Sequence, residues 1–425
     1  MPAASYPGPN TIHRRVLDNG ITVLVYENMF SNTIAIEGVV RAGALADLPE
    51  KAGLADFAAD LLIRGSRSRT FEEISEALES IGAGVSFGAS RHTTGFSTHS
   101  LAEDLDLVLD IAADALCRPS FPPEQVERLR GQTITGLQMR ANDTRSMARL
   151  AFHELAYPGH PFSRSVSGYL DTVPAITRDD ISAFHARYFG PRDMIIGLAG
   201  AIRADDALRR LEATFGGWRN EDQQLTPLAP DPSPPAGILR RHVAMPEKHQ
   251  ADIVMGLPGL RRSAPDYLDA SLMNTILGVF GMMGRIGQTV REEQGLAYYA
   301  SSRLEGGLGP GPWTAAVGVA ADKVDQAIES IRAEIRRIQD EPVPVEELAD
   351  SQAYRTGSLP MGLETNSGLV DIITDMELYS LGLDYLQDYT TVINAITPER
   401  IQAAARKYLS ADDLAIAVAG PVEAR

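Results

Sequence analysis

The sequence is poor in cysteine, in histidine and in long apolar runs. Cys117 is the single cysteine, so neither an intrachain disulfide nor a thiolate zinc cluster can form. Among the eight histidines, His153-Glu154 is followed by Tyr157 where a zincin helix would have a second histidine. No apolar run reaches the ~20 residues that a membrane-spanning helix needs. These absences exclude an intrachain disulfide, a thiolate zinc cluster and a zincin-type H-E-x-x-H site. They also predict a chain without a membrane span.

Basic residues are also in the minority. The 425 residues include 39 Lys and Arg against 56 Asp and Glu, which gives a formal net charge of −17. This imbalance disfavours binding to nucleic acid and to anionic membranes. The start of the chain, MPAASYPGPN, lacks the basic and apolar regions of a signal peptide. We therefore expect a cytoplasmic protein, although a periplasmic protein already trimmed of its leader would begin in the same way.

The two halves of the chain contain the same segment. Residues 175–200, AITRDDISAFHARYFGPRDMIIGLAG, match residues 395–420, AITPERIQAAARKYLSADDLAIAVAG, without a gap. Each copy predicts a helix capped by Thr177 or Thr397, then a turn and an apolar strand. A repeat of this length indicates duplicated domains rather than a solenoid.

The division between the halves is marked by proline. Residues 220–237, NEDQQLTPLAPDPSPPAG, have neither a helical nor a strand period and predict a stiff, solvated linker. We therefore expect an N-terminal domain of residues 1–220, a linker of residues 221–237 and a C-terminal domain of residues 238–425. Strand and helix patterns cluster without strict alternation. They predict an α+β fold with two homologous domains, each a mostly antiparallel sheet packed with helices.

One amphipathic helix shows where a metal site would be expected. In residues 52–66, AGLADFAADLLIRGS, the polar face carries Asp56, Ala59 and Asp60. Positions 56 and 60 project from one face, a turn apart. That spacing suits two metal ligands with a catalytic carboxylate beside them, as in the inverted zinc motif H-x-x-E-H. Asp, Ala and Asp at these positions make the motif degenerate.

Several further patterns accompany this helix in a fixed order. They are Asn19–Val25, Val39–Gly43, Arg64–Ser66, Tyr157–Phe162 and Gly295–Tyr298. As an ordered set they resemble the pitrilysin-type M16 zinc peptidases, specifically the two-domain bacterial members related to the mitochondrial processing peptidase. The resemblance covers nearly the whole chain. It implies two similar domains that face each other around a peptide-binding chamber.

The resemblance also implies what has been lost. The family has histidine, glutamate and histidine where this chain has Asp56, Ala59 and Asp60. A further glutamate ligand lies downstream in the family, but the matching residues 128–141, RLRGQTITGLQMRA, contain no acidic residue. Without a base or a third ligand, we expect no metal and no other cofactor in this chain. The alternative role of the two aspartates is that of a solvated helix face.

A substrate-clamping pair is implied in the C-terminal half. In VREEQGLAYYASS, Arg291 and Tyr298 have the seven-residue spacing of the arginine and tyrosine that the family places opposite the zinc. Gly295 is expected to end the helix that carries Arg291, and a strand follows. Both side chains donate hydrogen bonds that stabilise a developing oxyanion. Without the family pattern, a surface arginine and a core tyrosine would be the interpretation, and Tyr299 is the neighbouring alternative.

A glycine-rich run precedes this pair. In GVFGMMGRIG the glycines are Gly278, Gly281, Gly284 and Gly287, and no Lys-Ser/Thr follows to make a phosphate loop. The run departs from the family's Gly-Gly…Ser-Arg-Leu pattern. We expect either a mobile helix connection or close helix packing. Arg285 matches the family's arginine position, and its role stays open at this point.

The asymmetry between the halves predicts the function. A degenerate zinc half and a retained clamping half resemble the non-catalytic subunit of two-component bacterial M16 peptidases. We therefore expect a zinc-free chain that binds peptide, forms a heterodimer with a zinc-bearing M16 subunit and is inactive alone. The rival interpretation is a non-proteolytic scaffold, like the core subunits of respiratory complexes that share the fold.

Overall fold

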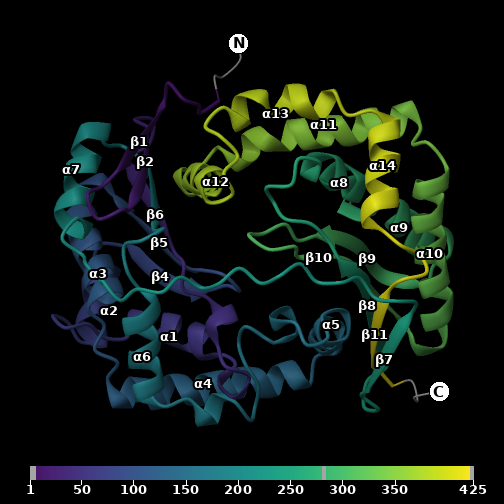
Figure 1. Ribbon diagram of the computed structural model, residues 1–425, viewed down its shortest axis with the longest axis horizontal. Coiled ribbons are helices and arrows are strands. Elements are labelled where there is room, and N and C mark those ends of the chain that lie inside the picture. Colours follow the sequence, from purple (N-terminus) through teal and green to yellow (C-terminus); the bar gives the residue numbers. More distant parts are fainter. Residues whose placement is uncertain (1–5, 280–283, 422–425) are drawn as a thin grey trace. The chain divides into compact units, whose positions relative to one another are not determined.

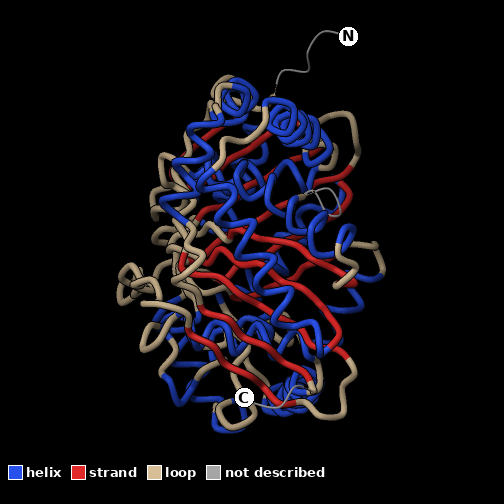
Figure 2. Tube along the Cα trace, turned by 90° about the vertical axis from the view of Figure 1, so that its right-hand side faces the viewer, coloured by secondary structure: helices blue, strands red, loops and turns tan. Residues whose placement is uncertain are grey.

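The computed structural model describes residues 6–279 and 284–421, which form two compact units. Each unit contains one sheet flanked by helices (Figure 1). Figure 2 shows the strands in red and the helices in blue. The predicted α+β fold with two sheet-and-helix domains is confirmed. No helix in the described ranges has the length and apolar character needed to cross a membrane.

The sheet of the first unit has six strands in the order β1-β2-β6-β3-β5-β4. The strands are β1 (Ile12–Val16), β2 (Thr22–Glu27), β3 (Thr33–Val40), β4 (Gly84–Ala89), β5 (Thr94–Leu101) and β6 (Ile195–Gly200). Strand β2 pairs with β6 in parallel, and every other pairing is antiparallel. Strand β4 therefore lies at the edge of this sheet.

The sheet of the second unit repeats this topology with five strands, in the order β7-β11-β8-β10-β9. The strands are β7 (Leu239–Ala244), β8 (Gln250–Pro258), β9 (Ala297–Leu304), β10 (Pro312–Ala320) and β11 (Ala415–Gly420). Again one pair, β7 and β11, is parallel and the rest are antiparallel. The repeated apolar strands β6 and β11 occupy equivalent places, and β9 lies at an edge, as β4 does in the first sheet.

The helices begin where the sequence has caps. Thr177 and Thr397 accept hydrogen bonds from the backbone of residues 180 and 400, as predicted. The helices of the N-terminal half are α1 (Leu54–Leu62), α2 (Phe71–Glu79), α3 (Leu105–Cys117), α4 (Pro123–Ala141), α5 (Thr144–Ala156), α6 (Arg178–Tyr188) and α7 (Ala204–Phe215). Those of the C-terminal half are α8 (Tyr267–Asn274), α9 (Arg285–Gly287), α10 (Val324–Asp340), α11 (Val345–Gly362), α12 (Asn366–Leu378), α13 (Tyr385–Asn394) and α14 (Pro398–Tyr408).

Two helices belong to the unit built mainly from the other half of the chain. The first unit comprises residues 1–137, 165–228 and 360–388, and the second comprises residues 138–164, 229–359 and 389–425. Helix α5 thus packs on β8 and β11, whereas α12 packs on β3 and β6. Gly197 of β6 permits the close approach of α12, because a Cβ there would lie 2.2 Å from Thr374 Oγ1. The predicted boundaries at 220 and 238 therefore differ from the observed units, because α5 belongs to the second unit and α12 to the first. We call this the exchange of α5 and α12.

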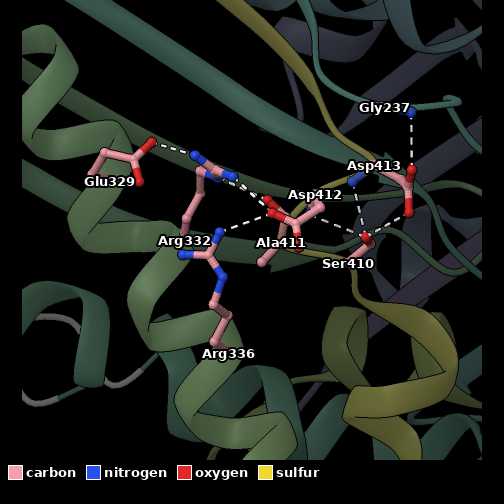
Figure 3. Close-up of polar contacts among 8 residues, drawn as sticks. All are labelled: Gly237, Glu329, Arg332, Arg336, Ser410, Ala411, Asp412 and Asp413. Carbon is pink, nitrogen blue, oxygen red and sulfur yellow. Dashed lines mark hydrogen bonds and ion pairs between the residues drawn. The ribbon is translucent and has the colours of Figure 1, made fainter.

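The proline-rich linker is anchored at both ends. At its start, Gln223 and Thr226 are buried, so the expectation of a solvated segment is wrong there. At its end, the Gly237 N–H donates to Asp413 Oδ1 at 2.9 Å (Figure 3). Asp413 stands in the turn of the second repeat, beside Asp412, which accepts from Arg332 and Arg336 at 2.8 Å each. The second copy of the repeat therefore fixes the point where the linker ends.

Candidate functional site

Helix α1 carries the degenerate metal positions in the first unit. It begins after Gly53, which has a φ of 100°. The Asp47 carboxylate accepts hydrogen bonds from the backbone N–H groups of Gly53 at 3.0 Å and Ala55 at 3.1 Å. This carboxylate satisfies backbone donors at the start of the helix, and its negative charge interacts favourably with the helix dipole. Phe57 and Leu61 enter the core, so the opposite face presents Asp56 and Asp60.

The three degenerate positions have different surroundings. Ala59 is fully buried, Asp56 is half-buried and Asp60 is exposed. Burial raises the pKa of Asp56, while hydrogen bonds from Ser167 and the Ala89 backbone oppose that rise. Although Asp60 reaches the surface, the surrounding protein and then the Asp56 charge raise its pKa to about 6. The face therefore holds two close carboxylates that repel each other, and no base accompanies them.

Helix α4 lies beside α1 where the resemblance implies a third ligand. The Arg130 guanidinium lies 5.5 Å from the centre of the Phe57 ring, and Arg64 Nη2 donates to Gln132 Oε1 at 2.8 Å. The α4 residues in these two contacts, one with α1 and one with the residue two positions after its end, are thus basic or neutral. Within residues 6–279 and 284–421, no group of three His, Cys, Asp or Glu side chains is placed to hold a metal ion. These residues do not fit catalytic zinc.

Arg291 and Tyr298 stand at a helix-to-strand junction in the second unit. Arg291 lies in a π-helical segment, Gln288–Glu293, where the sequence predicted an ordinary helix. The predicted end at Gly295 is confirmed: Gly295 has a φ of 61°, and the Leu296 N–H donates to the Val290 carbonyl at 2.9 Å. Arg291 is half-buried and lies 3.6 Å from the Glu292 carboxylate. Widened helical turns of this kind are frequent at functional sites.

A β-bulge distinguishes the two neighbouring tyrosines. Strand β9 pairs Tyr299 with Gly318 and then Ala297 with Val319, which leaves Tyr298 as the extra residue. Tyr298 is 80% exposed. A bulge redirects side chains, and bulges are common next to active sites. The strand therefore presents the Tyr298 side chain to solvent.

Tyr299 is instead held by its neighbours. Its hydroxyl donates to Asp252 Oδ1, and the Arg145 guanidinium lies 3.7 Å from the centre of its ring. Burial, followed by the Asp252 carboxylate, raises the pKa of Tyr299 far above its ordinary value. Asp252 also accepts from Thr144 Oγ1 at 2.5 Å. Tyr299 thus fastens the start of α5 to the sheet and is not free for substrate.

Arg285 has a structural partner. Its guanidinium binds both carboxylate oxygens of Glu347, at 2.8 Å and 2.7 Å, and the side chain is buried. This bidentate pair ties α9 to α11. The glycines nearby allow close backbone approach: a Cβ on Gly278 would lie 2.6 Å from the Ser302 nitrogen. Gly281 lies outside the described residues.

A cavity of about 500 Å³ in the second unit was not predicted from the sequence. It lies between α5, α8 and the β8–β10–β9 part of the sheet. Its wall includes Arg145, Arg149, Arg303 and Arg355, which come from three separate stretches of the chain. Such a convergence depends on tertiary contacts, so no local sequence pattern marks it.

Comparisons with known proteins agree across the chain. Residues 22–169 match the family model described as Insulinase (Peptidase family M16), and residues 175–354 match the model described as Peptidase M16 inactive domain. An uncharacterized zinc protease of Streptomyces coelicolor is 26% identical over 420 residues, which cover 98% of this chain and 91% of that protein. An uncharacterized zinc protease of Bacillus subtilis is 23% identical over 410 residues, covering 96% and 98%.

Solved structures show the same fold. A crystal structure from Pseudomonas fluorescens, described as a peptidase M16 inactive domain, superposes with a TM-score of 0.91 at 24% identity, covering 97% of this chain and 99% of that one. A protease from Helicobacter pylori gives a TM-score of 0.90 at 17% identity, covering 98% and 100%. At these identities the likeness establishes the architecture.

Proposed function

Since the chain belongs to the M16 peptidase family, we propose that it acts as the zinc-free partner subunit of a heterodimeric M16 metallopeptidase. The observation that carries the proposal is an asymmetry within one chain. Helix α1 has Asp56, Ala59 and Asp60 where hydrolysis needs two histidines and a base. Tyr298 is retained on a bulge with its ring exposed, and Arg291 precedes it by the family's spacing.

The chemistry is divided between the two subunits. The zinc-bearing partner supplies the activated water, which this chain cannot do. In this chain, the Arg291 guanidinium and the Tyr298 hydroxyl donate hydrogen bonds to the carbonyl oxygen of the scissile peptide. These bonds strengthen as that oxygen gains negative charge, so they stabilise the transition state more than the bound substrate. Edge strand β9, which carries Tyr298, offers backbone groups to an extended peptide, a mode that demands little sequence specificity.

The rival function is a scaffold without a proteolytic role, because fold alone does not determine function. The two functions make different demands on Tyr298. A scaffold gains nothing from an exposed phenol on a bulge, whereas a substrate clamp requires one. The exposure of Tyr298 therefore favours the peptidase subunit.

Reconstitution tests this function directly. We expect the chain to copurify with a co-expressed M16 subunit that has an intact H-x-x-E-H motif, and only the pair to cleave casein and short peptides. The zinc subunit alone is the control. Full activity of that subunit alone, unaffected by adding this chain, would refute the proposal.

We expect the purified chain to hold no stoichiometric zinc, because α1 and α4 supply neither two histidines nor a third ligand. The triple substitution Asp56→His, Ala59→Glu and Asp60→His should still give no peptidase, since α4 presents Arg130 and Gln132 to α1 and three protein ligands are needed. Elemental analysis and a chelator-sensitive peptide assay measure both. One tightly held zinc per wild-type chain, or hydrolysis by the triple variant, would contradict the assignment of these positions.

A further inference from the structure

The cavity of the second unit carries an unusual concentration of positive charge. Four arginines line it, Arg145, Arg149, Arg303 and Arg355, against one acidic residue, Glu305. This occurs in a chain whose formal net charge is −17. We call this cavity, defined by those four arginines, the arginine pocket.

Two of the four arginines in the pocket have no carboxylate partner among the described residues. Arg149 and Arg355 form no ion pair in the part of the chain that the structure describes. Arg355 Nε donates instead to the Tyr389 hydroxyl at 3.1 Å, and Arg303 lies 3.6 Å from Glu305. Guanidinium groups retain several donors under these conditions, so the pocket is prepared to receive an anion.

Two of these arginines are held close together by secondary structure. Arg145 and Arg149 are four residues apart on α5, so they share one helix face, where like charges destabilise a helix. Arg145 is fixed by stacking on Tyr299 at 3.7 Å. Both residues are exposed, so this cost is small, and a bound carboxylate would offset it.

The pocket also lies on the strand that carries the proposed clamp. It includes Ser301 through Leu304 of β9 and Glu305 after the strand, and Tyr298 lies three residues before Ser301. Three residues of strand span about 10 Å. An extended peptide whose carbonyl meets Tyr298 therefore reaches the pocket with a residue about three positions away.

We propose that the arginine pocket binds the carboxylate of an acidic residue about three positions from the scissile bond of a peptide substrate. This inference rests on the proposed function for its peptide ligand. Guanidinium groups match a carboxylate in planar, bidentate geometry. The wall also contains Phe152 and Leu304, which suit the methylene groups of a glutamate side chain. The overall negative charge disfavours polyanions such as nucleic acid.

Binding to the isolated chain tests the pocket without any partner. The probe is a fluorescein-labelled extended peptide with one glutamate, compared by fluorescence polarisation with the same peptide carrying glutamine. We expect the glutamate peptide to bind about tenfold more tightly. The double variant R149Q/R355Q should abolish this preference. Arg240→Gln is the matched control, because Arg240 is an exposed arginine of β7 paired with Asp325 and lies outside the pocket.

The outcomes separate the pocket from the proposed function. Charge-retaining R149K/R355K should keep part of the preference, because it retains the charge but loses the bidentate geometry, and this distinguishes lost charge from lost folding. In the reconstituted pair, moving the glutamate along the peptide should give the fastest cleavage when it is about three residues from the cut.

Cleavage that depends on Arg291 and Tyr298 but is insensitive to the position of glutamate would overturn the pocket assignment alone. A preference for glutamate in binding, without cleavage by any reconstituted pair, would support the pocket assignment and refute the proposed peptidase function. If inorganic phosphate bound the pocket as tightly as the glutamate peptide does, the assignment to a carboxylate would be overturned.

Discussion

Arg291→Ala and Tyr298→Phe are each expected to lower turnover of the reconstituted peptidase about 100-fold, while the two subunits still assemble. Loss of one donor to a developing oxyanion typically costs about 3 kcal/mol of transition-state stabilisation. Tyr298→Phe removes only a hydroxyl from a side chain that is 80% exposed, so the fold has little reason to change. The loss should therefore appear in kcat much more than in KM.

The neighbouring tyrosine supplies the matched control. Tyr299→Phe removes the same group one residue away on the same strand, but that hydroxyl binds Asp252. This variant should lower the melting temperature and leave turnover largely intact. Steady-state kinetics and size-exclusion chromatography of the pair measure both effects. A pair that assembles normally and works at full rate with Arg291 and Tyr298 both substituted would favour the scaffold.

Much of the fold follows from local pattern in the sequence. The repeat at residues 175–200 and 395–420 forms the equivalent strands β6 and β11, and both threonine caps lie where they were expected. Gly295 ends its helix with a positive φ, because glycine adopts that conformation without steric cost. These features depend on residues close in the chain, so residue type and spacing are enough to predict them.

Features that depend on distant contacts were not predictable in this way. The exchange of α5 and α12 is decided by which sheet buries each helix, and Gly197 reveals its reason only when Thr374 packs against it. The bulge at Tyr298 requires the register of β9 against β10. The arginine pocket joins α5, β9 and α11. The clamp residues were identified through resemblance, whereas their surroundings needed the tertiary fold.

The exchanged helix α12 covers an unusual carboxyl group. Glu37 of β3 lies opposite Gly197 of β6 in the sheet, on the face where α12 packs. Burial, then a hydrogen bond with Asp371 and the charges of Asp371 and Asp375, raise its pKa from the ordinary 4.5 to about 9. A pKa in that range favours the protonated form of Glu37 at neutral pH, and a protonated carboxyl is able to donate a hydrogen bond to the Asp371 carboxylate. The acidic side chains of α12 can approach the sheet because this proton removes one negative charge.

The pH dependence of this contact has a definite sign. A carboxyl whose folded pKa exceeds its unfolded value holds its proton more tightly in the native state. Its stabilising contribution is complete below about pH 4 and is lost progressively as the pH rises to about 9. Glu37→Gln keeps a donor for Asp371 and has no proton to lose. It should therefore unfold with a flatter pH profile than the wild type.

We expect Glu37→Gln to match the wild type near pH 5 and to exceed its stability at pH 9 by about 2 kcal/mol. The full pKa rise from 4.5 to about 9 would correspond to about 6 kcal/mol of stability. The expected difference is smaller because Glu37 is partly exposed and α12 can relax. Melting temperatures across this pH range measure the difference, with Glu79→Gln at the exposed end of α2 as control. Parallel profiles for Glu37→Gln and wild type would mean that Glu37 is already charged at neutral pH. A variant that gains stability over the wild type only as the pH rises would instead support a protonated Glu37 beneath α12.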